Sequence, residues 1–227
     1  MQILNFGPVF ASFDMLLDGA WLTIRRTVQA IILGTSVAIV CAWARTSGPK
    51  WTRPIVGAYV EVIRNTPFLL QLYFFFFGLP SLGIYMTPTE AALLAMVVNL
   101  GAYATEIIRA GVEAIPHGQT EAGAALGLRP VQVFLLIILL PALQIVYPPL
   151  AAQYTMVLLG SSLASAISAN ELTSSANILA SANFRTIEVY LLVTFMYLII
   201  VFIFRGLFAV FYNLVLARGR DRRMGLL

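Results

Sequence analysis

Long apolar runs separated by short polar stretches make up most of this chain. A helix of about twenty apolar residues crosses the hydrocarbon core of a bilayer, and runs of this kind predict membrane spans at residues 22–44, 54–79, 88–110, 143–165 and 187–216. The chain has room for little besides these spans and their connections. The pattern therefore predicts an all-α integral membrane protein, residues 1–227 forming one transmembrane domain of about five helices.

One polar and small-residue stretch, residues 116–130, interrupts the apolar pattern in the middle of the chain. Proline and glycine bracket a run of good helix formers, and Gly127 is placed to end the helix. Ala122, Ala125 and Leu126 fall on one face, where small side chains let a partner approach closely. Because a helix of two or three turns is marginal alone in water, we expect this helix to dock on another protein.

Proline positions predict where the other helices break. In the second span, Pro67 lacks the backbone donor that a continuous helix needs, so a break or kink is expected near Ile63. Glu61 and Arg64, one turn apart, allow two interpretations. They neutralise each other inside a helix bundle, or the freed backbone groups, Thr66 and Gln71 face a substrate path. In the third span, a capping box predicts a helix start at residues 87–90.

The apolar stretch after residue 130 is too long for one span. Prolines at 141, 148 and 149 predict a separate helix at 131–140, packed behind the polar stretch, and a fourth span at 143–165. Polar residues within the spans are candidates for a substrate path, although small and hydroxyl residues also serve simple helix packing. The candidates are Thr66, Gln71, Gln153, Ser161, Ser162 and Ser165.

The distribution of charge predicts the orientation. Basic residues follow the first span and close the chain, which places those segments in the cytoplasm and the N-terminus outside; they are Arg45, Lys50, Arg53, Arg218, Arg220, Arg222 and Arg223. The polar stretch at 116–130 is then cytoplasmic. Just before it, Glu106, Arg109 and Glu113 share one helix face and predict a salt-bridged helix end.

Composition excludes several classes of protein. With 60% hydrophobic and 11% charged residues and a mean hydropathy of +0.88, the chain belongs in a membrane, and its net charge of +4 reflects orientation rather than nucleic-acid binding. A single cysteine and a single histidine, Cys41 and His117, exclude an intramolecular disulfide and a multi-histidine metal site. The chain lacks a phosphate-binding loop, so any ATP is hydrolysed by another chain.

Several motifs in order carry a resemblance to a known family. Glu121-Ala122 with Leu126-Gly127, followed by an apolar run ending at Pro141, resembles the EAA loop of bacterial ABC importer permeases. Other segments resemble the polar amino acid uptake branch of that family, namely 64–67 with Gln71, 101–103, 106–111 and 115–119. The resemblance runs from about Gly19 to the end of the last span.

The resemblance implies the type I importer permease fold, with 116–130 as a cytoplasmic coupling loop in the bacterial inner membrane. It implies a second permease subunit, identical or homologous, two ATPase subunits that carry ATP and Mg²⁺, and a periplasmic binding protein that delivers a polar amino acid; no cofactor is expected in this chain. The implied ATPase-coupling residues are Gly118, Glu121, Ala122, Ala125, Leu126 and Gly127.

Two questions stay open at this level. Related permeases often have Lys-Asp-Thr-Ser-Leu where this chain has Leu159 and Gly160 in the two charged positions, which argues weakly against a basic substrate held by this subunit. A self-contained secondary carrier or channel is the alternative function, but it predicts an inverted repeat and buried acids, and the chain shows no clear repeat. An intramembrane enzyme would need a catalytic cluster, which the sequence does not offer.

Overall fold

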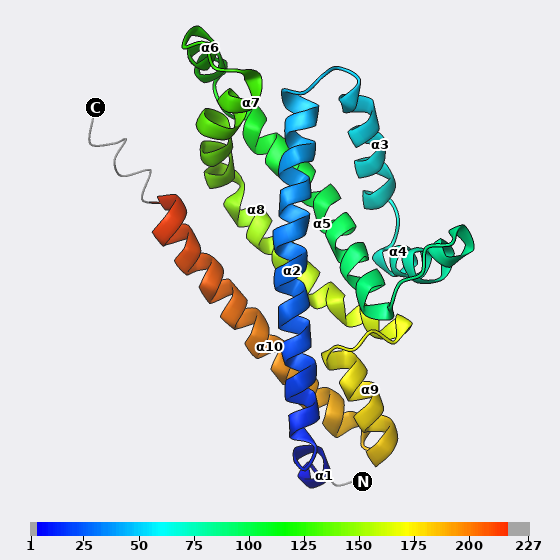
Figure 1. Ribbon diagram of the computed structural model, residues 1–227. Coiled ribbons are helices and arrows are strands. Elements are labelled where there is room, and N and C mark those ends of the chain that lie inside the picture. Colours follow the sequence, from blue (N-terminus) through cyan, green and yellow to red (C-terminus); the bar gives the residue numbers. More distant parts are fainter. Residues whose placement is uncertain (1–3, 218–227) are drawn as a thin grey trace. The chain divides into compact units, whose positions relative to one another are not determined.

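The computed structural model describes residues 4–217, and every regular element in that part of the chain is a helix. Four helical segments are long and apolar enough to cross a membrane, and α3 with the helices after it adds a fifth, bent candidate (Figure 1). The four are Phe13–Thr46, Pro88–Glu113, Pro130–Ile167 and Thr186–Leu214. The predicted fold class is confirmed.

The elements follow one another with short connections. The α-helices are α1 (Gly7–Phe10), α2 (Phe13–Thr46), α3 (Thr52–Arg64), α4 (Phe68–Tyr73), α5 (Pro88–Glu113), α6 (His117–Ala125), α7 (Pro130–Val133), α8 (Leu139–Gly160), α9 (Leu172–Asn183) and α10 (Thr186–Phe211). The tighter or wider turns are η1 (Phe74–Gly78), η2 (Leu79–Leu82), η3 (Phe134–Ile138), η4 (Ser161–Ile167) and η5 (Tyr212–Ala217). The first long helix begins at Phe13, earlier than the span expected from residue 22. The basic residues expected to close the chain lie outside the described residues.

The described residues form two compact units. The first unit contains residues 4–31, 67–97 and 155–204, and the second contains residues 32–66, 98–154 and 205–217. The long helices α2, α5, α8 and α10 contribute residues to both.

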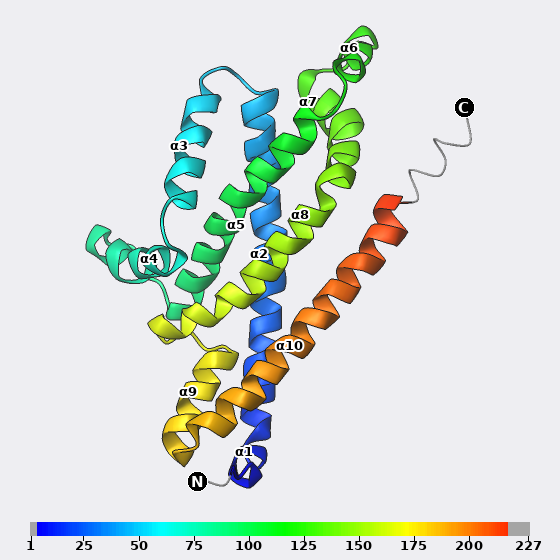
Figure 2. The same ribbon diagram turned by 180° about the vertical axis from the view of Figure 1, so that it is seen from behind.

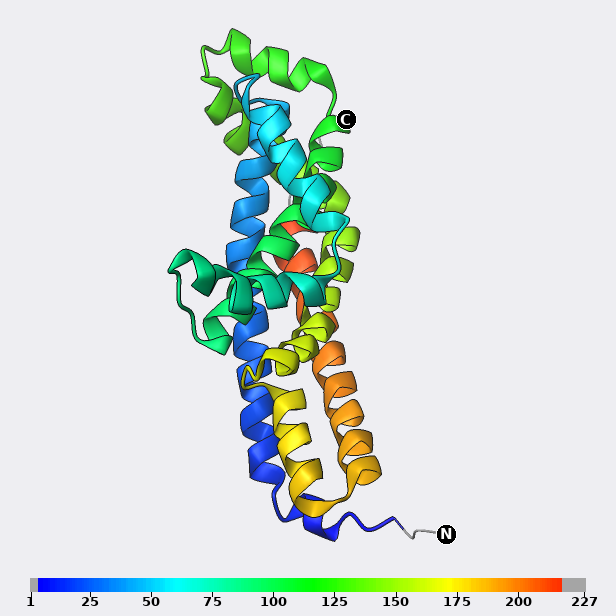
Figure 3. The same ribbon diagram turned by 90° about the vertical axis from the view of Figure 1, so that its right-hand side faces the viewer.

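In the first unit, α9 lies beside the early part of α2 and the early part of α10 (Figure 3). The Leu172 backbone N–H donates to Thr23 Oγ1 on α2 at 3.1 Å, and Thr173 and Tyr197 join α9 to α10 through their hydroxyls at 2.9 Å. A separate apolar cluster packs α4 against the start of α5 and η4; its buried members include Leu72, Ala91, Ala95, Ala164 and Ile167.

In the second unit, α3, α5 and the later part of α2 are neighbours (Figures 1 and 2). Glycines allow the close approach: a Cβ on Gly34 would lie 2.9 Å from a methyl group of Leu100, and a Cβ on Gly101 would lie 2.7 Å from the Tyr59 hydroxyl. That hydroxyl donates to the Val98 carbonyl at 2.7 Å. Small residues at such crossings are typical of helix packing in lipid.

The helix break in the second predicted span is confirmed. The α3 helix ends at Arg64 and α4 begins at Phe68, with Pro67 in an extended conformation between them. The capping box at the start of α5 is confirmed as well, because Glu90 accepts from the Thr87 N–H at 2.8 Å and its own N–H donates to the Thr87 hydroxyl at 3.3 Å.

The expected division of the fourth apolar region is wrong. Helical structure continues from Pro130 to Ile167, and Pro148 and Pro149 lie inside α8. A π-helical turn, η3, comes shortly before Pro141. Wider turns of this kind and contacts with neighbouring helices compensate for missing donors, which is why transmembrane helices tolerate proline.

Candidate functional site

The polar stretch between α5 and α7 folds as the short helix α6, at one end of the second unit (Figure 1). Pro116, with ψ 134°, is the N-cap residue, and the helix begins at His117. The helix ends in a Schellman motif: Leu128 N–H donates to the Gly123 carbonyl at 3.2 Å, and Gly127 N–H donates to the Ala124 carbonyl at 2.9 Å. Gly127 has φ +76°, a left-handed conformation that glycine adopts without steric cost.

One face of α6 is attached to the rest of the unit through Gly123, which is buried. A Cβ there would lie 2.8 Å from Ile137 Cδ1 and 2.9 Å from Val133 Cγ2. Glycine thus lets α6 press directly on α7 and η3. Sequence reasoning did not select this residue, although an isolated glycine inside a helical pattern is a signal of close packing.

The opposite side of α6 is open. All six residues predicted to contact an ATPase are exposed in this chain, and 78% of the surface of Leu126 is accessible. They lie along one short helix and its C-terminal cap, so the fold brings this predicted set together. The arrangement is a small-residue surface with one apolar side chain at its end and one carboxylate, Glu121, near its middle. Their role in coupling stays a prediction.

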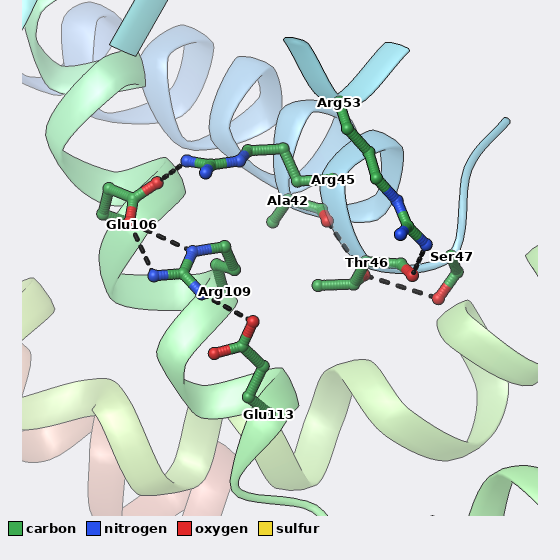
Figure 4. A network of polar contacts seen from close by, with 8 residues as sticks. All are labelled: Ala42, Arg45, Thr46, Ser47, Arg53, Glu106, Arg109 and Glu113. Carbon is green, nitrogen blue, oxygen red and sulfur yellow. Dashed lines mark hydrogen bonds and ion pairs between the residues drawn. The ribbon is translucent and has the colours of Figure 1, made fainter. Parts of the chain in front are cut away.

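An ionic network joins the end of α2 to the end of α5 (Figure 4). Arg109 donates to Glu106 at 2.9 and 3.0 Å and to Glu113 at 2.5 Å, which confirms the predicted salt-bridged face. Arg45 on α2 also pairs with Glu106, a contact between helices that spacing within α5 could not reveal. The network belongs to the unit that carries α6. Its residues line two cavities of that unit: Arg45 and Glu113 line the first, and Arg45 and Glu106 line the second.

The first cavity lies behind α6 and has a volume of about 420 Å³. Its lining combines polar residues from the α2–α3 connection and α6 with an apolar wall; representative residues are Arg45, Arg53, His117, Thr120, Leu128 and Phe134. The second cavity, of about 350 Å³, lies among α2, α3 and α5 and is lined by Arg45, Gly57, Ala58, Val60, Glu61, Arg64 and Glu106.

The residues around the α3 break do not neutralise each other. Arg64 lies over the ring of Tyr103, 5.4 Å from its centroid, and the Tyr103 hydroxyl donates to the Arg64 carbonyl at 3.3 Å. Between residues 4 and 217, no ion pair joins Arg64 to Glu61. The first reading of this charge pair is therefore wrong, and both groups face the second cavity instead.

The predicted substrate-path residues are divided between the units. Gln71, which is 6% exposed, and the three serines belong to the first unit, whereas Thr66 and Gln153 belong to the second. Each serine hydroxyl donates to a carbonyl three residues earlier in the helix, at 2.6 Å from Ser161, 2.7 Å from Ser162 and 2.8 Å from Ser165. The hydroxyl protons are thus occupied, and the oxygen lone pairs remain as acceptors. These residues stay candidates.

A buried carboxylate, Glu171, caps the first turn of α9. It is 2% exposed and accepts from the backbone N–H groups of Thr173 at 2.8 Å and Ser174 at 2.5 Å and from the Tyr197 hydroxyl at 2.9 Å. Burial raises the pKa of Glu171, while these hydrogen bonds oppose the shift. The group stabilises the α9 corner, a role that sequence spacing did not indicate.

The described residues contain no group of three or more histidine, cysteine, aspartate or glutamate side chains placed to hold a metal ion. What the geometry does offer is a set of apolar helices of spanning length, an exposed short helix, α6, at one end of a unit, and two polar cavities in the same unit, the first of them lined in part by α6. Together these features are those of a helical membrane protein with an exposed helix at one end of a unit.

Comparison with known proteins identifies the family. Residues 30–216 match the family model of the binding-protein-dependent transport system inner membrane component, so the chain belongs to that family. It is a permease component of an ABC importer and a multi-pass inner-membrane protein. The secondary-carrier alternative is thereby set aside.

Curated relatives share about a third of their residues with this chain. The L-cystine transport system permease protein TcyB of Bacillus subtilis is 34% identical, over 84% of this chain and 82% of its own length. The glutamine transport system permease protein GlnP of Escherichia coli K12 is 32% identical, over 86% of this chain and 90% of its own length. The octopine transport system permease protein OccM of Rhizobium radiobacter is 31% identical, over 96% of this chain and 94% of its own length.

Solved structures agree on the fold. A crystal structure of an amino acid ABC transporter with histidines contains a chain that is 28% identical, with a TM-score of 0.82, over 93% of this chain and 99% of that one. A chain in a crystal structure of the inward-facing MetNI methionine ABC transporter is 19% identical, with a TM-score of 0.73, over 89% of this chain and 97% of that one, and supports the fold alone.

Proposed function

We propose that this chain is the permease subunit of an ATP-driven importer of a polar amino acid and that, with a second permease, it forms the path across the membrane. The relatives that support an amino acid substrate are named for cystine and glutamine transport. A periplasmic binding protein delivers the substrate. Two ATPase subunits bind ATP and Mg²⁺, and this chain needs no cofactor of its own.

The exposed face of α6 is the observation that carries this proposal. Gly123 holds the helix against α7 and η3, and the Schellman motif ends it at Gly127, so its open face is presented on a defined support. Small residues there allow close approach by a cleft of the ATPase. Movement of that cleft then reaches η3 and α8 through a packed contact rather than through a loose loop.

The orientation follows from charge in the same unit. Arg45, Lys50 and Arg53 lie at the α2–α3 connection, within the unit that contains α6. By the positive-inside rule this connection is cytoplasmic. We place α6 on the cytoplasmic side with it, the N-terminus in the periplasm and the C-terminus in the cytoplasm of a bacterial cell.

A charge reversal on α6 tests the coupling role. Glu121 is exposed, and within residues 4–217 the structure records no hydrogen bond or ion pair of its carboxylate. Glu121→Lys should therefore leave insertion and thermal stability unchanged but abolish uptake and the ATPase stimulation by the binding protein. Asp18→Lys, at an exposed carboxylate on α2 in the other unit, is the matched control. Normal coupled uptake in Glu121→Lys would contradict the assignment.

The substrate class is tested on the reconstituted complex. Ligand-stimulated ATPase activity is measured with acidic, neutral and basic amino acids, sugars and inorganic ions, each with its binding protein present. Gly160→Asp is the companion variant, because the nearest atoms to a Cβ at Gly160 lie 3.9 Å away on Phe68, leaving room for a carboxylate. Activity confined to sugars or ions would reject an amino acid substrate. An unchanged profile in the variant would remove Gly160 from the path.

A further inference from the structure

The cavity among α2, α3 and α5 contains charges of both signs. Four ionisable side chains line it, Arg45, Glu61, Arg64 and Glu106, together with the small residues Gly57 and Ala58. Its volume of about 350 Å³ lies within the range of small-molecule sites. All of these residues belong to the unit that carries α6.

The contacts divide these four charges into two pairs of different kinds. Arg45 and Glu106 pair with each other, and Glu106 also accepts from Arg109, so these charges offset one another. Glu61 has no recorded hydrogen bond or ion pair of its carboxylate within the described residues. Arg64 rests on the Tyr103 ring, which holds a guanidinium in place without neutralising its charge.

One positive and one negative group therefore face the same cavity, one helical turn apart on α3, and within residues 4–217 neither forms an ion pair. A zwitterion fits that arrangement: Arg64 donates to a carboxylate, and Glu61 accepts from an ammonium group. Every free α-amino acid carries both groups on one carbon. The small side chains of Gly57 and Ala58 leave the remaining space for whatever side chain the amino acid has.

From this geometry we infer that the cavity is an exit-side subsite that binds the backbone ammonium and carboxylate of an imported amino acid through Glu61 and Arg64. The inference rests on the proposed function, because the exit side is assigned from α6 and the basic α2–α3 connection. The subsite binds only the α-ammonium and α-carboxylate groups, so it accepts amino acids with different side chains. It would therefore be occupied by product before release.

The test measures inhibition by trapped product. The complete transporter is reconstituted in vesicles with ATP inside, and uptake of the amino acid that performs best in the substrate screen is followed at increasing trapped L-glutamine. Trapped L-glutamine should slow uptake. Trapped N-acetyl-L-glutamine, which lacks the ammonium, and L-glutamine amide, which lacks the carboxylate, should each require concentrations about ten- to a hundredfold higher, the cost of one lost hydrogen bond to a charged group.

Two variants locate the effect. Glu61→Gln and Arg64→Gln should each raise the inhibitory concentration of trapped L-glutamine about ten- to a hundredfold. Lys50→Gln is the matched control, since it removes an exposed charge near the same helix but outside the cavity. If a variant does not insert, the comparison of the three trapped compounds in the unaltered protein still decides.

The outcomes separate this inference from the proposed function. Three results would overturn the subsite and leave the proposed transport function unaffected. They are uptake that trapped L-glutamine does not inhibit, equal inhibition by all three trapped compounds, and unchanged sensitivity to trapped L-glutamine in both variants. Absence of uptake for every amino acid would overturn both. Selective inhibition that disappears in Glu61→Gln and Arg64→Gln and persists in Lys50→Gln would establish the subsite.

Discussion

Replacing Gly123 with alanine should loosen α6 from its support. The added methyl group would lie 2.8 Å from Ile137 Cδ1 and 2.9 Å from Val133 Cγ2, closer than real side-chain carbons approach each other. Overpacking of this kind costs about 1–3 kcal/mol. Alanine also favours the helix by about 1 kcal/mol relative to glycine, so the net effect on the docked helix is the difference between the two.

Gly118→Ala in the same helix separates these two contributions. A Cβ at Gly118 would meet no atom within 4 Å, so only the gain in helix propensity remains. The two variants should therefore differ by about 1–3 kcal/mol in the free energy that holds α6 in place, the overpacking cost alone. Each 1.4 kcal/mol corresponds to tenfold in the opening equilibrium.

Hydrogen exchange of the α6 amides, in the permease reconstituted in nanodiscs, is the appropriate measurement because it reports local opening. Exchange should be faster in Gly123→Ala than in the unaltered protein and no faster in Gly118→Ala. In the complete transporter, Gly123→Ala should also lower the amount of substrate moved per ATP hydrolysed. Equal exchange in the two variants would refute the idea that Gly123 attaches the helix.

Three further predictions concern the cap, the buried acid and the topology. Gly127→Ala, at φ +76°, should destabilise the end of α6 by about 1 kcal/mol, whereas Gly206→Ala, where a Cβ meets nothing within 4 Å, should not lower the thermal midpoint. Burial raises the pKa of Glu171 above its ordinary 4.5, so the folded state binds the proton more tightly than the unfolded state. The free energy of unfolding should therefore fall as pH rises from 4.5 through the raised pKa. If the same pH dependence persists in Glu171→Gln, it comes from another group. In a Cys41→Ala background, single cysteines that replace the exposed residues Ser47 and Thr120 should be labelled from the cytoplasm, and those that replace the exposed residues Ser81 and Ser181 should be labelled from the periplasm. Periplasmic labelling at position 120 would reverse the proposed orientation.

Local chemistry in the sequence was enough to predict the class of fold and the short helix α6. Apolar runs of spanning length have few alternatives to a membrane helix, because lipid offers the backbone no hydrogen-bond partners. Pro67 ends α3 and Gly127 ends α6 through their own backbone restrictions, which neighbours do not change. The Glu106–Arg109–Glu113 face follows from helical spacing alone.

Contacts between distant segments were decided only by the tertiary structure. Whether Pro148 and Pro149 end a helix depends on the neighbouring turns and helices that compensate for the missing donors, and here α8 continues through them. Spacing within one helix could not show that Arg45 reaches Glu106, that Arg64 rests on Tyr103 rather than pairing with Glu61, or that Gly123 seats α6 on Val133 and Ile137. Each of these depends on the distance between two helices, which packing sets and local sequence does not.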